Sequence, residues 1–420
     1  MKESPPTNSV ESWAEKVTPC HTNRRTALKC LAAGLVVTSN PIPLWAARTN
    51  RGQPWGGFVT PPTWRSLEVA TGDTLIVPAK VSGVAIDAVL DSGSGASIIS
   101  KSLAAKLGMT NLEPRRINGL GGKAPVGLVR NVAVMLGAYA PVLPFAVIAD
   151  LGAVSAAFGR PIDMLLGADV LAGGCVALDF ATRRFAFEKP ASFVPGPEWT
   201  TLSLGHGAKQ ELFVLASIAG LDPVPLMLDF GSSSALILSS AYIETHALLA
   251  GKPVSTAALG GVEGVQIVKS FIADTVSLGP LSIASVPALA LDHWTSVSTV
   301  GNVGMPLLGQ FDIVLDVFKG LLWLRASPPR GRLPMLKDRS GLGLAVSATE
   351  LTVVHVASGS PADQAGWVLG EHVVAVNGRV IDVFYTRGSL WQWRYGPAGS
   401  RVTLKLADGT TRMLTLADYY

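Results

Sequence analysis

The chain has 420 residues, of which 48% are hydrophobic and only 15% are charged, and it contains 44 glycines and 28 prolines. This composition suits turn-rich β structure spread over several domains, and it excludes a disordered or coiled-coil protein. The formal net charge of +4 is small for this length and no basic run exceeds a short pair, so we expect no nucleic-acid partner.

The N-terminal segment differs in kind from the rest of the chain. Arg24-Arg25 precedes a short apolar run from Cys30 to Val37, and the small residues Ala46-Ala47 follow. This order is typical of an export signal, and the paired arginines resemble a twin-arginine signal. We therefore expect residues 1–47 to direct export to the periplasm, with an unstructured tail as the alternative. The apolar run is too short to span a bilayer, so we expect no integral membrane segment in the mature chain.

Two of the three cysteines, Cys20 and Cys30, lie in this segment, so the folded part keeps only Cys175. No intramolecular disulfide is then possible. Cys175 stands in an apolar, strand-like run without a nearby histidine, and this setting favours a buried structural cysteine over a catalytic thiol.

Two stretches of one kind organise the middle of the chain. Each is an apolar run that ends on an acid and then breaks into Gly and small hydroxyl residues, from Ile86 to Ser94 around Asp91 and from Val224 to Ser232 around Asp229. A second apolar run follows each acid, so each stretch predicts a strand, a tight turn and another strand. Short helices are expected next, at 102–107 and 240–249.

Further features follow the two acids in the same order. They are Gly-rich segments at Gly119 to Gly122 and Leu259 to Gly261, apolar segments with glycine at Met164 to Asp169 and Pro306 to Phe311, and Leu-Asp pairs at Leu178-Asp179 and Leu315-Asp316. Several matches in one order with nearly constant spacing predict a duplicated β domain. We place its copies at residues 55–195 and 196–327.

Paired carboxylates of this kind have a distinct chemistry. Two carboxyl groups held close together cannot easily both ionise, so they share one proton and can act as base and acid together. Such a pair can take a proton from water and give one to a carbonyl oxygen, which hydrolyses a peptide bond without a metal or cofactor. Gly93 and Gly231 let the chain turn sharply beside Asp91 and Asp229. The candidate supporting hydroxyls are those of Ser92, Ser94 and Ser232.

The segment Asp91-Ser92-Gly93-Ser94 matches the D-[ST]-G-[ST] signature, so residues 60–327 resemble the aspartic proteases, the first copy more closely than the second. The resemblance implies two retropepsin-like β-barrel lobes of one chain that form one cleft, with Asp91 and Asp229 as the catalytic pair and a peptide or protein as substrate. It also implies a monomer. Two Gly-rich loops resemble the flaps that cover a bound peptide, namely Gly119, Leu120, Gly121 and Gly122, and Leu259, Gly260 and Gly261.

The second copy departs from the signature at Phe230, where Ser or Thr is expected. One hydroxyl that would bridge the two turns is therefore missing, although Asp229 is kept. Three states stay open: a working pair, a homodimer that uses Asp91 twice, and an inactive peptide-binding scaffold. The six histidines are scattered without metal-ligand spacing, which disfavours a zinc hydrolase.

A Pro- and Arg-rich linker at 328–337 precedes a segment at 338–420 that is long enough to fold alone. Its main features are the loop Gly341, Leu342, Gly343 and Leu344, a helix start at Ser360-Pro361, and the turn Asn377-Gly378. This order resembles a PDZ domain, an α+β fold, and a small β domain with glycine turns is the alternative. The resemblance implies that the loop binds the terminal carboxylate of a peptide, beside a groove helix at 385–394.

Overall fold

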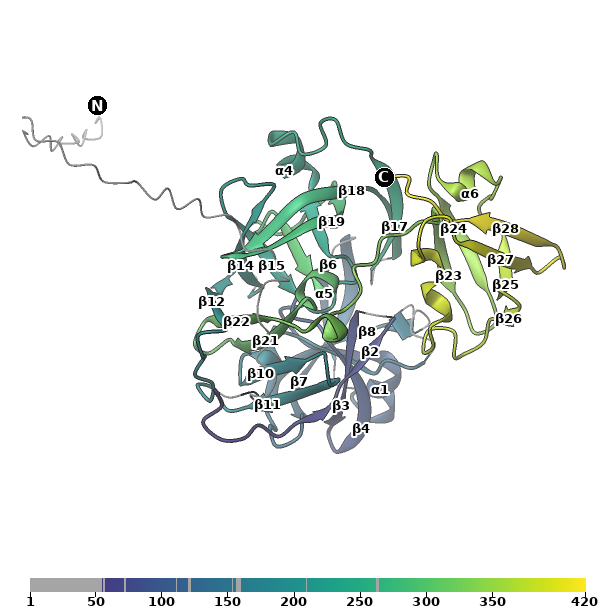
Figure 1. Cartoon of the computed structure of the whole chain (residues 1–420). Helices are drawn as coiled ribbons and strands as arrows, with labels where there is room; N and C mark the ends of the chain where they lie inside the picture. The colour runs from purple at the N-terminus through teal and green to yellow at the C-terminus, as the bar shows by residue number, and fades with distance from the viewer. Residues whose placement is uncertain are drawn as a thin grey trace, which may run out of the picture. The chain divides into compact units, whose positions relative to one another are not determined.

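The computed structural model describes residues 55–420, except residues 56, 72, 111, 120, 121, 153, 156–159, 209, 262 and 263. Side chains are also left undescribed at 116–119, 122–125, 261 and 264. The expected export signal at 1–47 therefore lies outside the described residues. The described chain is mainly β, which confirms the expected fold class (Figure 1). In this part of the chain no helix is both long and apolar enough to cross a membrane.

The first half of the chain forms an eight-stranded sheet. In spatial order its strands are β2 (Glu68–Ala70), β3 (Thr74–Val81), β4 (Val84–Leu90), β9 (Met164–Leu166), β5 (Ile98–Ser100), β8 (Val142–Ala149), β7 (Gly122–Met135) and β6 (Glu113–Gly119). Alternate residues of β3 face different clusters, since Leu75 and Val77 pack in the main core and Ile76 packs in a smaller one. Ser82 and Gly83 have positive φ and make the tight turn to β4, where a glycine is favoured.

A second eight-stranded sheet repeats this order strand for strand. Its strands are β13 (Gly205–His206), β14 (Leu212–Ile218), β15 (Val224–Asp229), β20 (Gly301–Gly304), β16 (Leu236–Ser239), β19 (Leu281–Leu291), β18 (Gly264–Leu278) and β17 (Ser255–Gly261). The extra pairing of β3 with β7 is likewise matched by that of β14 with β18. The two halves therefore have one topology, as the repeated sequence features predict.

Short helices follow matching strands in the two halves. They are α1 (Lys101–Lys106), α3 (Ala168–Leu171), α4 (Ser240–Thr245) and α5 (Met305–Leu308). The hydroxyls of Ser100 and Ser239 cap α1 and α4 by accepting an amide hydrogen of the first turn. The helices expected after each acid are thus present, although α4 ends at Thr245, before the expected end at 249.

One predicted match between the halves is wrong. The strand beside β4 is β9, and the strand in the same place beside β15 is β20, so Gly167 corresponds to Gly304. Pro306 and the two leucines after it lie in α5 instead. The Leu-Leu-Gly motif of β9 is not repeated in β20, because β20 carries Asn302 where β9 carries Leu165.

A six-stranded sheet joins the halves. Its strands are β1 (Arg65–Ser66), β11 (Arg184–Glu188), β10 (Cys175–Asp179), β21 (Phe311–Asp316), β22 (Leu321–Ala326) and β12 (Thr200–Ser203). β10 of the first half pairs directly with β21 of the second. Cys175 is fully buried in β10, as expected for a structural cysteine.

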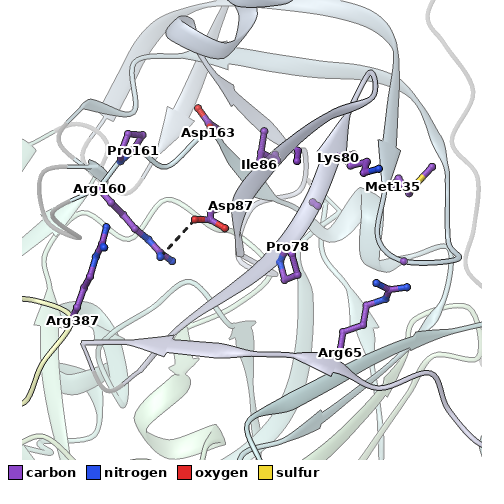
Figure 2. A pocket seen from close by; sticks show the side chains of 13 residues that line it. Arg65, Pro78, Lys80, Ile86, Asp87, Met135, Arg160, Pro161, Asp163 and Arg387 are labelled. Atoms are coloured by element: carbon purple, nitrogen blue, oxygen red, sulfur yellow. Dashed lines mark ion pairs between the residues drawn. The ribbon is translucent and has the colours of Figure 1, made fainter. Parts of the chain in front are cut away.

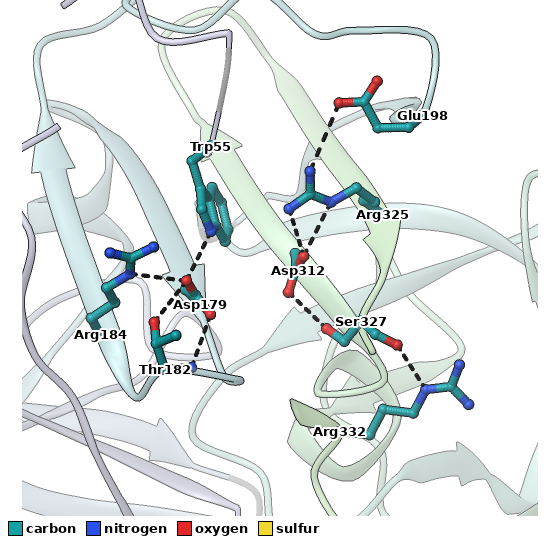
Figure 3. A network of polar contacts seen from close by, with 9 residues as sticks. All are labelled: Trp55, Asp179, Thr182, Arg184, Glu198, Asp312, Arg325, Ser327 and Arg332. Atoms are coloured by element: carbon teal, nitrogen blue, oxygen red, sulfur yellow. Dashed lines mark hydrogen bonds and ion pairs between the residues drawn. The ribbon is translucent and has the colours of Figure 1, made fainter. Parts of the chain in front are cut away.

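Two buried acids stabilise this shared sheet through complementary partners (Figure 3). Asp179 accepts hydrogen bonds from Trp55 Nε1 at 2.8 Å and from Arg184 Nε at 2.9 Å. Asp312 accepts from Arg325 Nη2 at 2.8 Å and, as Figure 3 shows, from the hydroxyl of Ser327. Buried carboxylates need such donors, because an unpaired charge in a sheet would be costly.

The C-terminal segment forms its own sheet and its own hydrophobic core. The strands are β23 (Leu342–Val346), β24 (Leu351–Val356), β25 (His372–Val376), β26 (Arg379–Val380), β27 (Arg401–Leu406) and β28 (Thr411–Thr415). Helix α6 (Pro361–Gln364) is capped by Ser360, as predicted. In the stretch before the sheet, a single 3₁₀ turn, η2 (Pro329–Gly331), interrupts the extended linker.

The groove helix expected at 385–394 is wrong in extent and type. Only η3 (Leu390–Tyr395) is helical there, and it is a 3₁₀ helix. The backbone amide of Arg387 instead donates to the carbonyl oxygen of Phe384, three residues before it, as in a turn. The next two residues, Gly388 and Ser389, are weak helix formers, which explains why an α-helix does not extend across them.

Candidate active site

The two acids leave the ends of equivalent buried strands. Asp91 directly follows β4, and Asp229 is the last residue of β15. The last three residues of each strand are buried, and each strand lies inside its sheet, next to β9 or β20. Both carboxyl groups are therefore carried by rigid elements, which a reactive pair requires.

Each carboxyl group lies against the glycine of the opposite turn. A Cβ atom placed on Gly93 would be 2.6 Å from Cγ of Asp229, and one placed on Gly231 would be 2.5 Å from Oδ1 of Asp91. A side chain at either glycine would collide with the acid across from it. The close approach of the two turns therefore requires glycine at both positions.

Ser92 connects the two turns. Its hydroxyl donates to the carbonyl oxygen of Leu228 at 2.7 Å and accepts from the amide of Phe230 at 2.9 Å. Phe230 is fully buried in the main core and has no hydroxyl to return this contact. One side chain therefore bridges the turns where the signature would supply two.

The other two predicted supporting serines act through their backbone. Ser94 Oγ donates to the carbonyl oxygen of Ala96 at 2.7 Å, and Ser232 Oγ donates to that of Ser234 at 3.4 Å. Their backbone amides donate to main-chain carbonyl oxygens of the acids, Ser94 to Asp91 at 3.2 Å and Ser232 to Asp229 at 3.4 Å. The amides of Gly93 and Ser94 also oppose the rise in the pKa of Asp91. In the second turn the amide of Gly231 donates to Oδ1 of Asp229 at 3.0 Å, and the amides of Gly231 and Ser232 oppose the rise in the pKa of Asp229.

Sequence reasoning missed Asn302, which contacts the pair directly. Its Nδ2 donates to Oδ2 of Asp229 at 2.6 Å, and the residue is fully buried in β20. The signal that could have revealed it was the spacing of Asn302-Val303-Gly304 from Asp229, which is one residue shorter than that of Leu165-Leu166-Gly167 from Asp91.

A third acid near the turns was also missed. Asp73 lies just before β3 and is 2% exposed. It accepts hydrogen bonds from the hydroxyls of Thr71 and Thr74, at 3.3 and 3.2 Å, and from that of Ser233 in the second turn. Burial raises the pKa of Asp73 to about 7, against these hydrogen bonds.

The environment raises the pKa of both acids above the ordinary value of an aspartic acid. Burial raises the pKa of Asp91 to about 7, and the negative charge of Asp229 adds to the rise. Burial also raises the pKa of Asp229, while hydrogen bonds from Asn302 and the turn amides oppose the rise. Two such groups can hold one proton between them over the acid to neutral range.

The two Gly-rich segments belong to equivalent hairpins. In the first, Gly119 of β6 pairs with Gly122 of β7, and the intervening Leu120 and Gly121 lie outside the described residues. The second hairpin joins β17 to β18, where Gly261 pairs with Gly264.

The predicted residues of the second hairpin, Leu259, Gly260 and Gly261, thus end a strand and precede the turn. A Cβ on Gly260 would meet nothing within 4 Å, so this strand end has open space beside it.

The predicted carboxylate loop of the C-terminal segment has its first amides occupied. Gly341 N donates to Oδ2 of Asp338 at 2.7 Å, and Leu342 N donates to Oγ of Ser340 at 3.0 Å. The remaining loop residues, Gly343 and Leu344, lie in β23 at the edge of the sheet.

A hollow of about 900 Å³ is lined mainly by residues of the first half (Figure 2). Its charged lining includes Arg65, Lys80 and Arg160, and Arg160 is 3.6 Å from the carboxylate of Asp87. Neither Asp91 nor Asp229 lines it, so it is separate from the candidate active site. Among the residues with described side chains, no His, Cys, Asp and Glu groups gather in a way that could hold a metal ion.

The chain resembles known proteins over part of its length. The family described as "Aspartyl protease" matches residues 77–170, which include Asp91. No curated protein matches the chain. A solved retropepsin-like aspartic protease from Rickettsia conorii is 17% identical, with a TM-score of 0.25, and covers 30% of this chain and 92% of its own. Basic 7S globulin from soybean is 9% identical, with a TM-score of 0.37, and covers 65% of this chain and 99% of its own. The family match supports aspartic protease activity.

Proposed function

We propose that this protein is an aspartic endopeptidase in which Asp91 and Asp229 act together on one water molecule. The observation that supports the pair is the approach of each carboxyl group to the glycine of the opposite turn, at Gly93 and Gly231. The buried strands that carry them and the Ser92 bridge hold this geometry.

The chemistry follows from one proton shared by two acids. The ionised carboxyl accepts a proton from water as the water oxygen attacks the peptide carbonyl carbon, and the protonated carboxyl donates to the carbonyl oxygen. No metal or organic cofactor is required for these steps. Because burial raises the pKa of Asp91 to about 7, activity should fall as the pH rises above this value and the pair loses its shared proton.

The two alternative functions, a homodimeric protease and an inactive scaffold, differ from the proposal in the role of Asp229. In a homodimer that uses Asp91 twice, Asp229 would be dispensable, yet Asp229 lies beside Gly93 of the same chain. In an inactive scaffold neither acid would matter for cleavage, and Phe230 is the observation that favours this possibility. The Ser92 hydroxyl still joins both turns despite Phe230.

Digestion of a peptide library at acidic and neutral pH separates these functions. We expect both Asp91→Asn and Asp229→Asn to abolish cleavage, while Asp222→Asn, which removes an exposed carboxyl, retains it. Activity in Asp229→Asn but not in Asp91→Asn would support the homodimer. No cleavage by the unmodified chain, together with retained peptide binding, would support the scaffold.

We also propose that residues 338–420 form a PDZ-like module that binds peptide along β23, the edge strand of its sheet. Since Asp338 already occupies the amide of Gly341, recognition of a terminal carboxylate requires the remaining loop amides or displacement of Asp338. Binding of one fluorescent peptide with a free and an amidated C-terminus tests this. Equal affinity for the two would contradict carboxylate recognition and leave only strand pairing.

The division into lobes at 55–195 and 196–327, a monomeric state and export to the periplasm remain parts of this proposal. Fractionation of a bacterial host followed by N-terminal sequencing tests export. Protein found only in the cytoplasm, with its intact N-terminus from Lys2 onward, would overturn it.

A further inference from the structure

The two halves differ at one buried position beside the acids. In β20, Asn302 lies opposite Met227 of β15, and the equivalent position in β9 is Leu165, opposite Val89 of β4. Both residues are buried, but only Asn302 has polar atoms. An otherwise repeated framework therefore gives one acid a neighbour that the other lacks.

The contact made by Asn302 has a defined polarity. Its Nδ2 donates to Oδ2 of Asp229 at 2.6 Å, and its own Oδ1 has no hydrogen-bond partner among the described residues. An amide NH₂ can only donate, so this bond stabilises the ionised carboxylate, and donation to a charged acceptor is the stronger kind. The apolar side chain of Leu165 offers no such donor in the first half.

We propose that Asn302 is a positioning residue that holds Asp229 as the ionised member of the pair and so leaves the shared proton on Asp91. This inference rests on the proposed function. It assigns Asp229 as the base that takes the proton from water and Asp91 as the acid that protonates the carbonyl oxygen.

Protons and charge balance in this assignment. The water oxygen bonds to the carbonyl carbon, one water proton moves to Asp229, and the carbonyl oxygen takes the proton of Asp91. The tetrahedral product is a neutral gem-diol, and the pair still holds one proton and one negative charge, now exchanged between the two acids.

The surrounding groups are consistent with this asymmetry. Hydrogen bonding by Asn302 opposes the rise in the pKa of Asp229 that burial causes, whereas the charge of Asp229 raises the pKa of Asp91. Two other carboxyls lie nearby: Asp73 accepts from Ser233 of the second turn, and Asp169 accepts two hydrogen bonds from Ser97 beyond the first.

The test uses the full chain and the variant Asn302→Leu, which copies the first half. The side chains are similar in volume and Leu removes the unpaired Oδ1, so we expect the variant to fold. Gln310→Leu is the matched control, because the Gln310 amide donates to Pro306 and Leu333, away from the pair. Carbon-13 NMR of labelled aspartate carboxyls, assigned with Asp91→Asn and Asp229→Asn, follows each group through a pH titration.

We expect Asp229 to ionise before Asp91 in the unmodified protein, and its midpoint to rise by about one to two pH units in Asn302→Leu. The acidic limb of kcat/KM against pH should move in the same direction with little change in KM. Gln310→Leu should change neither.

An unchanged Asp229 midpoint in folded Asn302→Leu would overturn the inference, as would earlier ionisation of Asp91 in the unmodified protein. The titration does not require turnover. A shifted midpoint in a protein without peptidase activity would therefore uphold the role of Asn302 and reject the proposed function.

Discussion

Replacing Asp73 by Asn is expected to stabilise the protein increasingly as the pH rises from about 4 to about 7. Asp73 is buried, and its hydrogen-bond donors are the neutral hydroxyls of Thr71, Thr74 and Ser233 and the backbone amide of Thr74. These donors do not compensate the loss of hydration, so the folded state keeps Asp73 protonated well above the ordinary range of an aspartic acid.

The sign follows from which state binds the proton. Between the unfolded pKa of about 4 and the folded pKa of about 7, the folded state holds a proton that the unfolded chain has released. The contribution of Asp73 to stability is thus complete below pH 4 and is lost as the pH rises through 7. Each unit is worth about 1.4 kcal/mol, so the difference from Asp73→Asn should grow by about 4 kcal/mol over this window.

Urea unfolding at pH 4, 5.5, 7 and 8.5, followed by circular dichroism, measures this difference. Asp222→Asn removes an exposed carboxyl and serves as the control, with a difference from the unmodified protein that should stay nearly flat. The change with pH is the relevant quantity, because it cancels any constant effect of the amide. Parallel curves for the unmodified protein and Asp73→Asn would refute the reasoning.

Three further predictions concern the bridging turn and the core. Ser92→Ala should lower the free energy of unfolding by about 2–6 kcal/mol, because it leaves two buried backbone groups unpaired at about 1–3 kcal/mol each, whereas Ser94→Ala should lower it by about 1 kcal/mol. Urea unfolding midpoints measure both losses, and equal losses would contradict the bridging role of Ser92. Phe230→Thr restores the signature but should lower the melting temperature, because the loss of a fully buried ring costs about 3–5 kcal/mol. Calorimetry measures the melting temperature, and an unchanged value would be inconsistent with the burial of Phe230. Burial raises the pKa of the Cys175 thiol to about 12, so iodoacetamide should modify this residue only in denaturant. Mass spectrometry detects the modification, and rapid labelling of the native protein would contradict the burial of Cys175.

Local patterns were enough to predict the two turns and the repeated β architecture. Asp91 and Asp229 each end an apolar run before a glycine, and this requirement is contained within a few neighbouring residues. The expectation that both acids would stand at strand ends is therefore confirmed. Their catalytic role stays a prediction.

The features that were missed depend on contacts between distant segments. Asn302 follows Asp229 by a long stretch of chain, and the more regular motif at Leu307 and Leu308 masked its place in the repeat. Asp73 looks like any acid in a hairpin turn, because one of its hydrogen-bond donors, Ser233, comes from the other half. Residue types alone cannot reveal such partners.

The serines show a different limit. Ser94 and Ser232 were expected to donate to the acids through their hydroxyls, but the turn directs those hydroxyls to backbone carbonyls, and in the second turn the amide of Gly231 donates to Asp229 instead. Sequence indicates that donors are available, while the backbone conformation decides which atom donates.

The shared sheet has a consequence for how substrate could enter and product could leave. β10 and β21 are buried along their whole length, and their register runs from Cys175 opposite Asp316 to Leu178 opposite Ile313. A hinge motion between the halves would expose this ladder and leave buried backbone groups unpaired, at about 1–3 kcal/mol each. Under the proposed function, the shared sheet should therefore keep the two halves fixed relative to each other during catalysis.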